Sequence, residues 1–253
     1  MSLQDWIYSV YPPNAVVNGR WGILHISVIA VCVIWIAVIS RMRGKGRRAR
    51  ENTVLILACL ILFLELARRV INLSRGYTDF ATLVYILVPR PWCAISCWLV
   101  IAAAFTRKKI LYSFSAMNAL LNALVFFAWP NVGFHHRVIL FEDFYSISTH
   151  ALLLITSVSM MTLELTDYRY KKADLQKMLI LLAGVFAYGA LEILLDIEPD
   201  PLFFMPGSDV QDFLGVGYGV FLVIYTVFLA VYCNVFYLVQ KGITACRQKV
   251  PVS

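Results

Sequence analysis

Long apolar runs constrain this chain more than any other feature of its sequence. A helix needs about 20 apolar residues to cross the hydrocarbon core of a bilayer. Seven stretches approach that length, and they cover residues 21–40, 52–73, 91–105, 110–129, 144–165, 178–195 and 213–239. The third is long enough only if it extends back towards residue 80. Because lipid offers the backbone no hydrogen-bond partner, we expect helices, and therefore an all-α polytopic protein with seven transmembrane helices.

The overall composition agrees with a membrane location. Hydrophobic residues make up 60% of the 253 residues and charged residues only 15%, whereas a soluble domain needs more charge to cover its surface. The first residues lack a basic start followed by a short apolar core, so no cleavable signal is expected. No linker or soluble module divides the chain. We expect one domain over residues 1–253, in the cell membrane.

The basic residues indicate how the chain is oriented. Most of the 22 lysines and arginines fall after the first, third and fifth apolar stretches and in the C-terminal tail. The positive-inside rule assigns these segments to the cytoplasm. The prediction is an N-terminus outside, a cytoplasmic C-terminus and an odd number of spans. Topology thus explains the net charge of +7, and no nucleic-acid partner is predicted.

Polar side chains within the apolar stretches need a reason, because they are costly in lipid. One such residue per stretch falls in the predicted outer half, and the set is His25, Glu65, Cys93, Asn122, His150, Glu192 and Tyr218. We expect them to line a cavity that opens outwards or into the outer leaflet. For Glu65 the alternative is an ion pair within its own helix, since Arg68 and Arg69 follow about one turn later.

Cys93 is the predicted nucleophile. Pro91 suits the first position of a helix, which places Cys93 in the first turn, beside unpaired backbone N–H groups and the positive end of the helix dipole. That position favours the reactive thiolate. The alternative is an inert, packed thiol. The six cysteines show neither zinc-type nor disulfide-framework spacing, and no metal site is predicted.

His150 is the predicted general base. An imidazole within reach of the Cys93 thiol would take its proton and return it to the leaving group. His25 would complete or orient this pair. The alternative for His150 is a hydrogen bond to a neighbouring helix. The proposed chemistry requires no metal and no organic cofactor.

These residues also carry a resemblance to a known family. Residues 86–93 resemble the leucine-proline-x-histidine-leucine-cysteine motif of the YwaF-type integral membrane protein family, with Pro91 in place of the histidine. Residues 22–25 are similar to that family's first-helix glycine-x-x-histidine. Glu65 matches its second-helix acid, and residues 148–150 match its later serine-histidine.

The resemblance implies a function. An animal relative, transmembrane protein 164, is described as a cysteine-dependent acyltransferase of ether phospholipids, and by that likeness Cys93 carries the acyl group and His150 is the base. We expect an acyltransferase or lipase that acts on phospholipid acyl chains, with membrane lipids as partners. The alternative is a non-enzymatic protein with the same outward cavity, such as a transporter, receptor or lipid-binding subunit. The sequence carries no specific mark of a protein partner.

Overall fold

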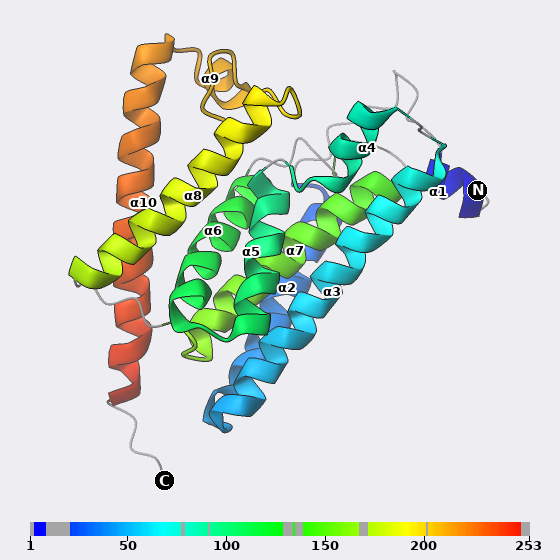
Figure 1. Cartoon of the computed structure of the whole chain (residues 1–253). Coiled ribbons are helices and arrows are strands. Elements are labelled where there is room, and N and C mark those ends of the chain that lie inside the picture. The colour runs from blue at the N-terminus through cyan, green and yellow to red at the C-terminus, as the bar shows by residue number, and fades with distance from the viewer. Residues whose placement is uncertain are drawn as a thin grey trace.

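The chain is helical throughout the part that the structure describes, without a strand (Figure 1). This computed structural model describes residues 3–8, 21–76, 79–90, 92–128, 134, 139–166, 172–200 and 202–248. The long helices are α2 (Ile23–Ser40), α3 (Arg47–Ser74), α5 (Trp92–Thr106), α6 (Lys109–Ala128), α7 (Phe141–Thr162), α8 (Lys172–Leu194) and α10 (Tyr218–Gln248). The short ones are α1 (Leu3–Tyr8), η1 (Arg41–Gly44), α4 (Phe80–Leu87) and α9 (Asp209–Leu214). The all-α prediction is confirmed.

Five helices of the described chain are long and apolar enough to cross a membrane. They are Ile23–Gly44, Lys109–Ala128, Phe141–Thr162, Ala173–Leu194 and Tyr218–Gly242. α5 is apolar but has only 15 residues. α3 has 28 residues, but Glu65, Arg68 and Arg69 interrupt its apolar stretch. The protein is therefore an integral membrane protein with five candidate spans, and the count of seven stays a prediction.

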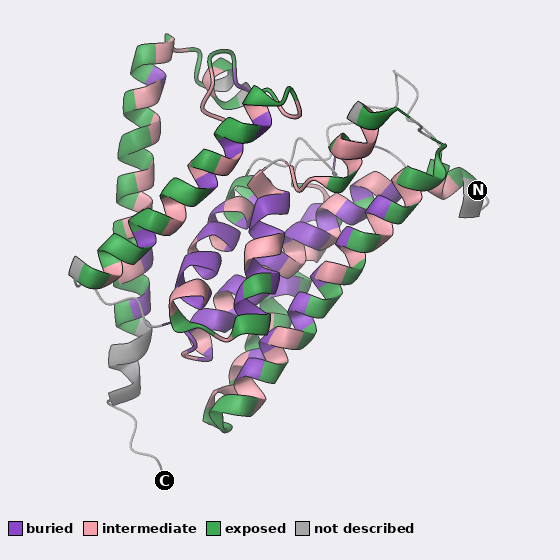
Figure 2. Cartoon of the chain, viewed as in Figure 1, coloured by how far each residue is buried: buried purple, intermediate pink, exposed green. Residues whose placement is uncertain are grey.

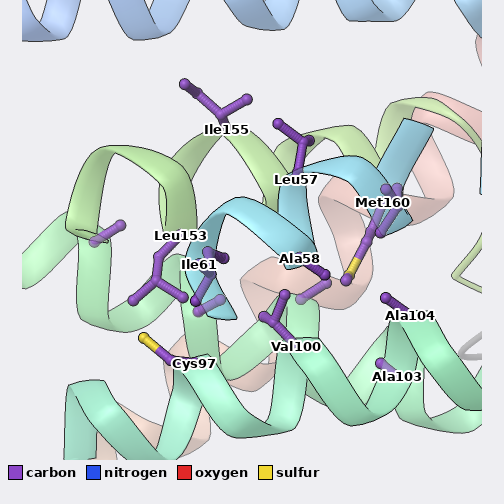
Figure 3. Close-up of a cluster of buried hydrophobic side chains, with 14 of the residues drawn as sticks. Leu57, Ala58, Ile61, Cys97, Val100, Ala103, Ala104, Leu153, Ile155 and Met160 are labelled. Carbon is purple, nitrogen blue, oxygen red and sulfur yellow. The ribbon is translucent and has the colours of Figure 1, made fainter. Parts of the chain in front are cut away.

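The bundle, by which we mean α2, α3, α5, α6 and α7, holds the main apolar core (Figures 1 and 2). Figure 3 shows its centre, where α3, α5 and α7 contribute the fully buried Ile61, Val100 and Leu153. Ala58 and Ala104, also fully buried, take little space between these helices. Small residues let helices approach closely, and close packing is what stabilises helix contacts in lipid.

α8 and α10 both lie along one side of the bundle, where we call them the α8–α10 pair, and most of their residues are exposed (Figures 1 and 2). A smaller apolar cluster joins this α8–α10 pair to the bundle, and its buried members are Ile95, Phe114, Met178, Val185 and Leu202. The Tyr232 hydroxyl of α10 also donates to the backbone oxygen of Met117 on α6, at 2.6 Å. The outer faces of the pair are apolar, which suits contact with lipid.

The third apolar stretch does not extend back to residue 80 as one helix. Asp79 instead caps a separate helix, α4, by accepting a hydrogen bond from the Thr82 backbone N–H at 2.7 Å. This bond lowers the pKa of the Asp79 carboxyl. Val88, which follows α4, is extended because the residue before a proline disfavours the helical conformation. α5 then begins at Trp92.

The seventh predicted stretch is also divided. Ser208 caps α9 by accepting a hydrogen bond from the Gln211 backbone N–H at 3.2 Å. Gly215 ends α9 with a φ of 63°, a left-handed conformation that glycine adopts without strain. The last helix therefore begins at Tyr218 and not at residue 213, and it extends to Gln248.

Candidate functional site

Cys93 is the second residue of α5 and is half-buried, which confirms its predicted place in the first turn. The guanidinium group of Arg68, on α3, lies within electrostatic range of its thiol. Cys97 lies one turn later, is fully buried and belongs to the core shown in Figure 3. Of the two thiols of α5, that of Cys93 is the more accessible.

A network from α6 holds the first turn of α5. The Asn122 amide group donates to the Ser96 hydroxyl at 2.7 Å and to the Asn118 backbone oxygen at 3.0 Å. The Asn118 side-chain oxygen in turn accepts a hydrogen bond from the Trp92 indole N–H at 3.2 Å. Trp92 and Ser96 flank Cys93 in the sequence, so Asn118 and Asn122 together position the helix that carries the thiol.

His150 lies on α7 in the tautomer that a general base needs. Its Nδ1 is 2.8 Å from the backbone oxygen of Ser146. A carbonyl oxygen only accepts hydrogen bonds, so Nδ1 carries the proton and Nε2 keeps the lone pair. The ring also stacks on Phe126, with centroids 3.9 Å apart and planes inclined by 8°. Neither contact involves Cys93, so the pairing of the two residues stays a prediction.

His25 has the opposite tautomer. The Trp21 backbone N–H donates to His25 Nδ1 at 3.3 Å, which leaves the proton on Nε2. His25 is fully buried, and its Nε2 meets no acceptor among the described residues. This histidine is therefore arranged as a hydrogen-bond donor and not as a base.

An aromatic cluster separates the two histidines. Its members are Phe126, Phe127 and Phe134. His25 contacts Phe127 and Phe134, with centroid distances of 6.0 and 4.7 Å, whereas His150 stacks on Phe126. His25 thus approaches His150 through phenylalanine rings and not by a hydrogen bond.

Glu65 is fully buried on α3 and has two side-chain partners. Its carboxylate pairs with the Arg69 guanidinium at 2.5 Å and also accepts a hydrogen bond from the Tyr145 hydroxyl of α7. Arg69 donates further to the Leu87 backbone oxygen at 3.2 Å, at the end of α4. The ion pair within the helix, considered as an alternative, is confirmed with Arg69. The sequence did not indicate Tyr145.

The last two predicted site residues belong to the α8–α10 pair. Glu192, on α8, is only 2% exposed, and neither of its carboxylate oxygens has a hydrogen-bond partner within the described chain. Tyr188, one turn earlier, donates its hydroxyl to the Pro89 backbone oxygen at 3.0 Å. Tyr218 begins α10 and contacts the Phe221 ring at a centroid distance of 6.4 Å.

A cavity of about 850 Å³ lies where the C-terminal ends of α3 and α8 meet α4. Its wall carries three arginines, Arg68, Arg75 and Arg90, and two acids, Glu142 and Asp196. We call it the arginine cavity. The described residues contain no group of three or more His, Cys, Asp or Glu side chains that could hold a metal ion, here or elsewhere.

Carboxylates anchor the arginines of this cavity. Glu142 lies 3.3 Å from Arg68 and 4.0 Å from Arg75, and Glu198 lies 2.7 Å from Arg90. Burial lowers the pKa of Arg90 and the bond to Glu198 opposes that shift, so the guanidinium keeps its charge at neutral pH. Sequence patterns did not reveal the site, because its partners lie as far as 108 positions apart in the chain.

Most of the chain matches one known protein family. No curated protein and no solved structure matches the chain. A family model described as the TMEM164 family matches residues 18–237. This range includes every residue of the candidate site and most of the chain. The protein therefore belongs to the TMEM164 family.

Proposed function

We propose that this protein is a membrane-embedded acyltransferase or lipase that acts on phospholipid acyl chains, with Cys93 as nucleophile. The observation that carries the proposal is the position of the thiol. It is half-buried in the first turn of α5, within electrostatic range of Arg68, which also lines the arginine cavity. A nucleophile needs such access to a substrate, and the nearby cation offsets part of the cost that burial imposes on the thiolate. Membership of a membrane protein family supports lipid as the substrate.

The reaction would proceed in two steps. Cys93 Sγ attacks the carbonyl carbon of an acyl ester, and His150 Nε2 takes the thiol proton and passes it to the departing alcohol. The acyl group then leaves the resulting thioester for the hydroxyl of a second lipid, or for water if the enzyme is a lipase. Backbone N–H groups in the first turn of α5 would hold the oxyanion. A free thiolate is costly in apolar surroundings, so the proton would move as the sulfur attacks.

We also propose that α3 and α5 bring the number of spans to seven, with the N-terminus outside and the protein in the cell membrane. The 28 residues of α3 are roughly 42 Å long at 1.5 Å per residue, more than the thickness of the hydrocarbon core. The pairing of Glu65 with Arg69 supports a crossing, because it neutralises two of the three charges that interrupt the apolar stretch. The YwaF-type resemblance is consistent with this topology.

A second candidate is a non-enzymatic lipid-binding protein. The observation that favours it is that three of the predicted site residues have structural partners. Glu65 pairs with Arg69, Asn122 bonds Ser96, and His150 stacks on a phenylalanine. Such contacts hold helices together without any reaction.

Trapping of the acyl-enzyme decides between the candidates. The full-length protein in lipid nanodiscs is incubated with a phospholipid that carries an isotopically labelled acyl chain, and its peptides are analysed by mass spectrometry. We expect a hydroxylamine-sensitive acyl adduct on Cys93. The Cys233→Ser variant, which lacks a half-buried thiol of α10, serves as the control and keeps the adduct. A protein that binds the lipid but never carries label on Cys93 is not a thiol acyltransferase.

A further inference from the structure

The arginine cavity is large enough for a ligand. Its volume of about 850 Å³ falls in the upper part of the range for small-molecule sites. It is formed at helix ends and not in the middle of the apolar core. Residues from α3, α4, the segment between α4 and α5, the first turn of α7 and the segment after α8 form its wall. A membrane protein meets the polar headgroup region of the bilayer at such helix ends.

The hydrogen-bond donors on the wall favour an anion. Three guanidinium groups line the wall together with two carboxylates, those of Glu142 and Asp196, and Glu198 pairs with Arg90 from beside it, so the donors and not a net charge set the preference. Each guanidinium has five N–H donors in a planar fork, and the anchoring carboxylates occupy only some of them. This fork matches the oxygens of a phosphate group better than an ammonium does.

The arginines are held but not fully covered. The side chains of Arg68, Arg75 and Arg90 are 32%, 28% and 11% exposed, respectively. The Arg90 guanidinium also lies over the Tyr85 ring, another wall residue. Their orientation is therefore set in advance, which lowers the entropy lost when a ligand binds.

The cavity also offers an acceptor that lacks a donor. Asn72 lines the wall, and its side-chain oxygen is buried without a hydrogen-bond partner in the part of the chain that the structure describes. A buried acceptor of this kind costs free energy unless a ligand or water donates to it. A ligand with an anionic group and a nearby hydroxyl or ammonium would satisfy both the arginines and Asn72.

We propose that the arginine cavity binds the phosphate group of its ligand through Arg68, Arg75 and Arg90. The ligand is either a phospholipid headgroup or a soluble phosphate ester. The choice of the lipid rests on the proposed function. Arg90 precedes Cys93 by three residues, so their Cα atoms lie within about 11 Å of each other. A phosphate held there would keep the ester bonds of the same lipid close to the thiol.

The test measures binding by the full-length protein in a neutral, lipid-free detergent, with native mass spectrometry as the readout. The ligands are a diacyl phospholipid, the diacylglycerol with the same acyl chains, and glycerol 3-phosphate. The variants are Arg68→Gln, Arg75→Gln and Arg90→Gln, all in the Cys93→Ser background. Arg107→Gln is the matched control, because Arg107 is a half-buried arginine paired with Glu51 at 3.5 Å, away from the cavity wall.

We expect the phospholipid to bind more tightly than the diacylglycerol, and each cavity variant to lose about tenfold in phospholipid affinity. Arg107→Gln keeps the affinity of the parent. If glycerol 3-phosphate binds with the same affinity and the same dependence on the arginines, the phosphate site stands and its ligand is soluble. The variants Arg68→Lys and Arg90→Lys keep the charge without the fork, so they should fold and fall between the parent and the glutamine variants.

Two results would overturn the inference. One is a set of folded cavity variants that bind the phospholipid as well as the parent does. The other is a diacylglycerol affinity equal to that of the phospholipid. Because the background lacks the thiol, binding is scored independently of acyl transfer. If the arginine variants lose phospholipid binding but the protein with Cys93 never forms an acyl-enzyme, only the proposed function is wrong. If the acyl-enzyme forms but phospholipid binding does not depend on the arginines, only the phosphate site is wrong.

Discussion

The helix pair α6 and α7 and the helix pair α8 and α10 are similarly apolar but are packed very differently. In the most apolar 18-residue window of each helix, 61% of the residues are buried in α6 and in α7, against 22% in α8 and 6% in α10. Two buried carboxylates show the same contrast. Glu65 in the bundle has Arg69 and Tyr145 as partners, whereas Glu192 on α8 has no ion-pair partner among the described residues and only the Tyr188 hydroxyl near its carboxylate. The comparison teaches that the bundle fixes positions, and that α8 and α10 add lipid-facing surface.

The largest expected effect is on the rate of acyl transfer, and it distinguishes the Cys93 thiol of the bundle from the Cys233 thiol of α10. Cys93→Ser should lower acyl transfer by about a thousandfold or more, because serine at this position lacks the nucleophilicity of the thiol. Cys233→Ser, on α10, should leave the rate unchanged. Both cysteines are half-buried, so exposure alone does not distinguish them. Transfer of a labelled acyl chain between lipids in nanodiscs measures the rates, and equal rates for both variants would remove Cys93 from the mechanism.

The next effect concerns the two histidines beside the aromatic cluster. His150→Gln should lower the transfer rate by roughly 10²–10⁴-fold, the usual contribution of a general base. His25→Gln should keep a rate near that of the parent, since its tautomer does not suit a base. The same assay applies, with thermal unfolding as a check on folding. A greater loss in His25→Gln than in His150→Gln would reverse these assignments.

Substitution of the two buried carboxylates tests how much each region contributes to the free energy of unfolding. Glu65→Ala should destabilise the protein by about 3–5 kcal/mol, because it leaves the Arg69 guanidinium buried without its partner. Glu192→Leu should be neutral or stabilising, since the substitution removes a buried carboxylate and the neighbouring Tyr188 hydroxyl keeps its hydrogen bond to the Pro89 backbone oxygen. The free energy of unfolding in detergent is the measurement. Marked destabilisation by Glu192→Leu would show that α8 is as tightly specified as the bundle.

Truncation of two valines, one in each region, gives the smallest expected change in the free energy of unfolding. Val100→Ala, in the centre of α5, should cost about 1–2 kcal/mol, because Val100 is fully buried and its truncation leaves a cavity. Val231→Ala, on α10, should cost less than about 0.5 kcal/mol, since lipid replaces the lost methyl groups around a residue that is 55% exposed. The same unfolding measurement applies. A large cost at Val231 would indicate that another protein surface covers α10.

Much of the helical structure was predictable from hydropathy. Long apolar runs leave the backbone no alternative in lipid, so α6 and α7 begin and end within three residues of the predicted limits. The first turn of α5 was also predictable, because a proline precedes Trp92. The division between α4 and α5 and the late start of α10 were missed. Both depend on local conformations, at Val88 and Gly215, that an average over an apolar stretch does not resolve.

The arginine cavity was beyond the reach of sequence patterns. Periodicity relates residues a few positions apart, whereas the bond between Arg90 and Glu198 joins segments separated by 108 positions. Tyr145 was missed as a partner of Glu65 for the same reason, since 80 positions separate them. The tautomers of His25 and His150 likewise follow from backbone contacts that only the fold creates.

The bond between Arg90 and Glu198 has a consequence for how the protein responds to its bilayer. It ties the segment before α5 to the segment after α8, so one wall of the arginine cavity depends on a helix with few packing contacts of its own. A mismatch between bilayer thickness and the length of an apolar helix changes the tilt of that helix, most readily where few neighbours hold it. We therefore expect acyl composition to alter substrate entry through α8 while the bundle keeps its shape.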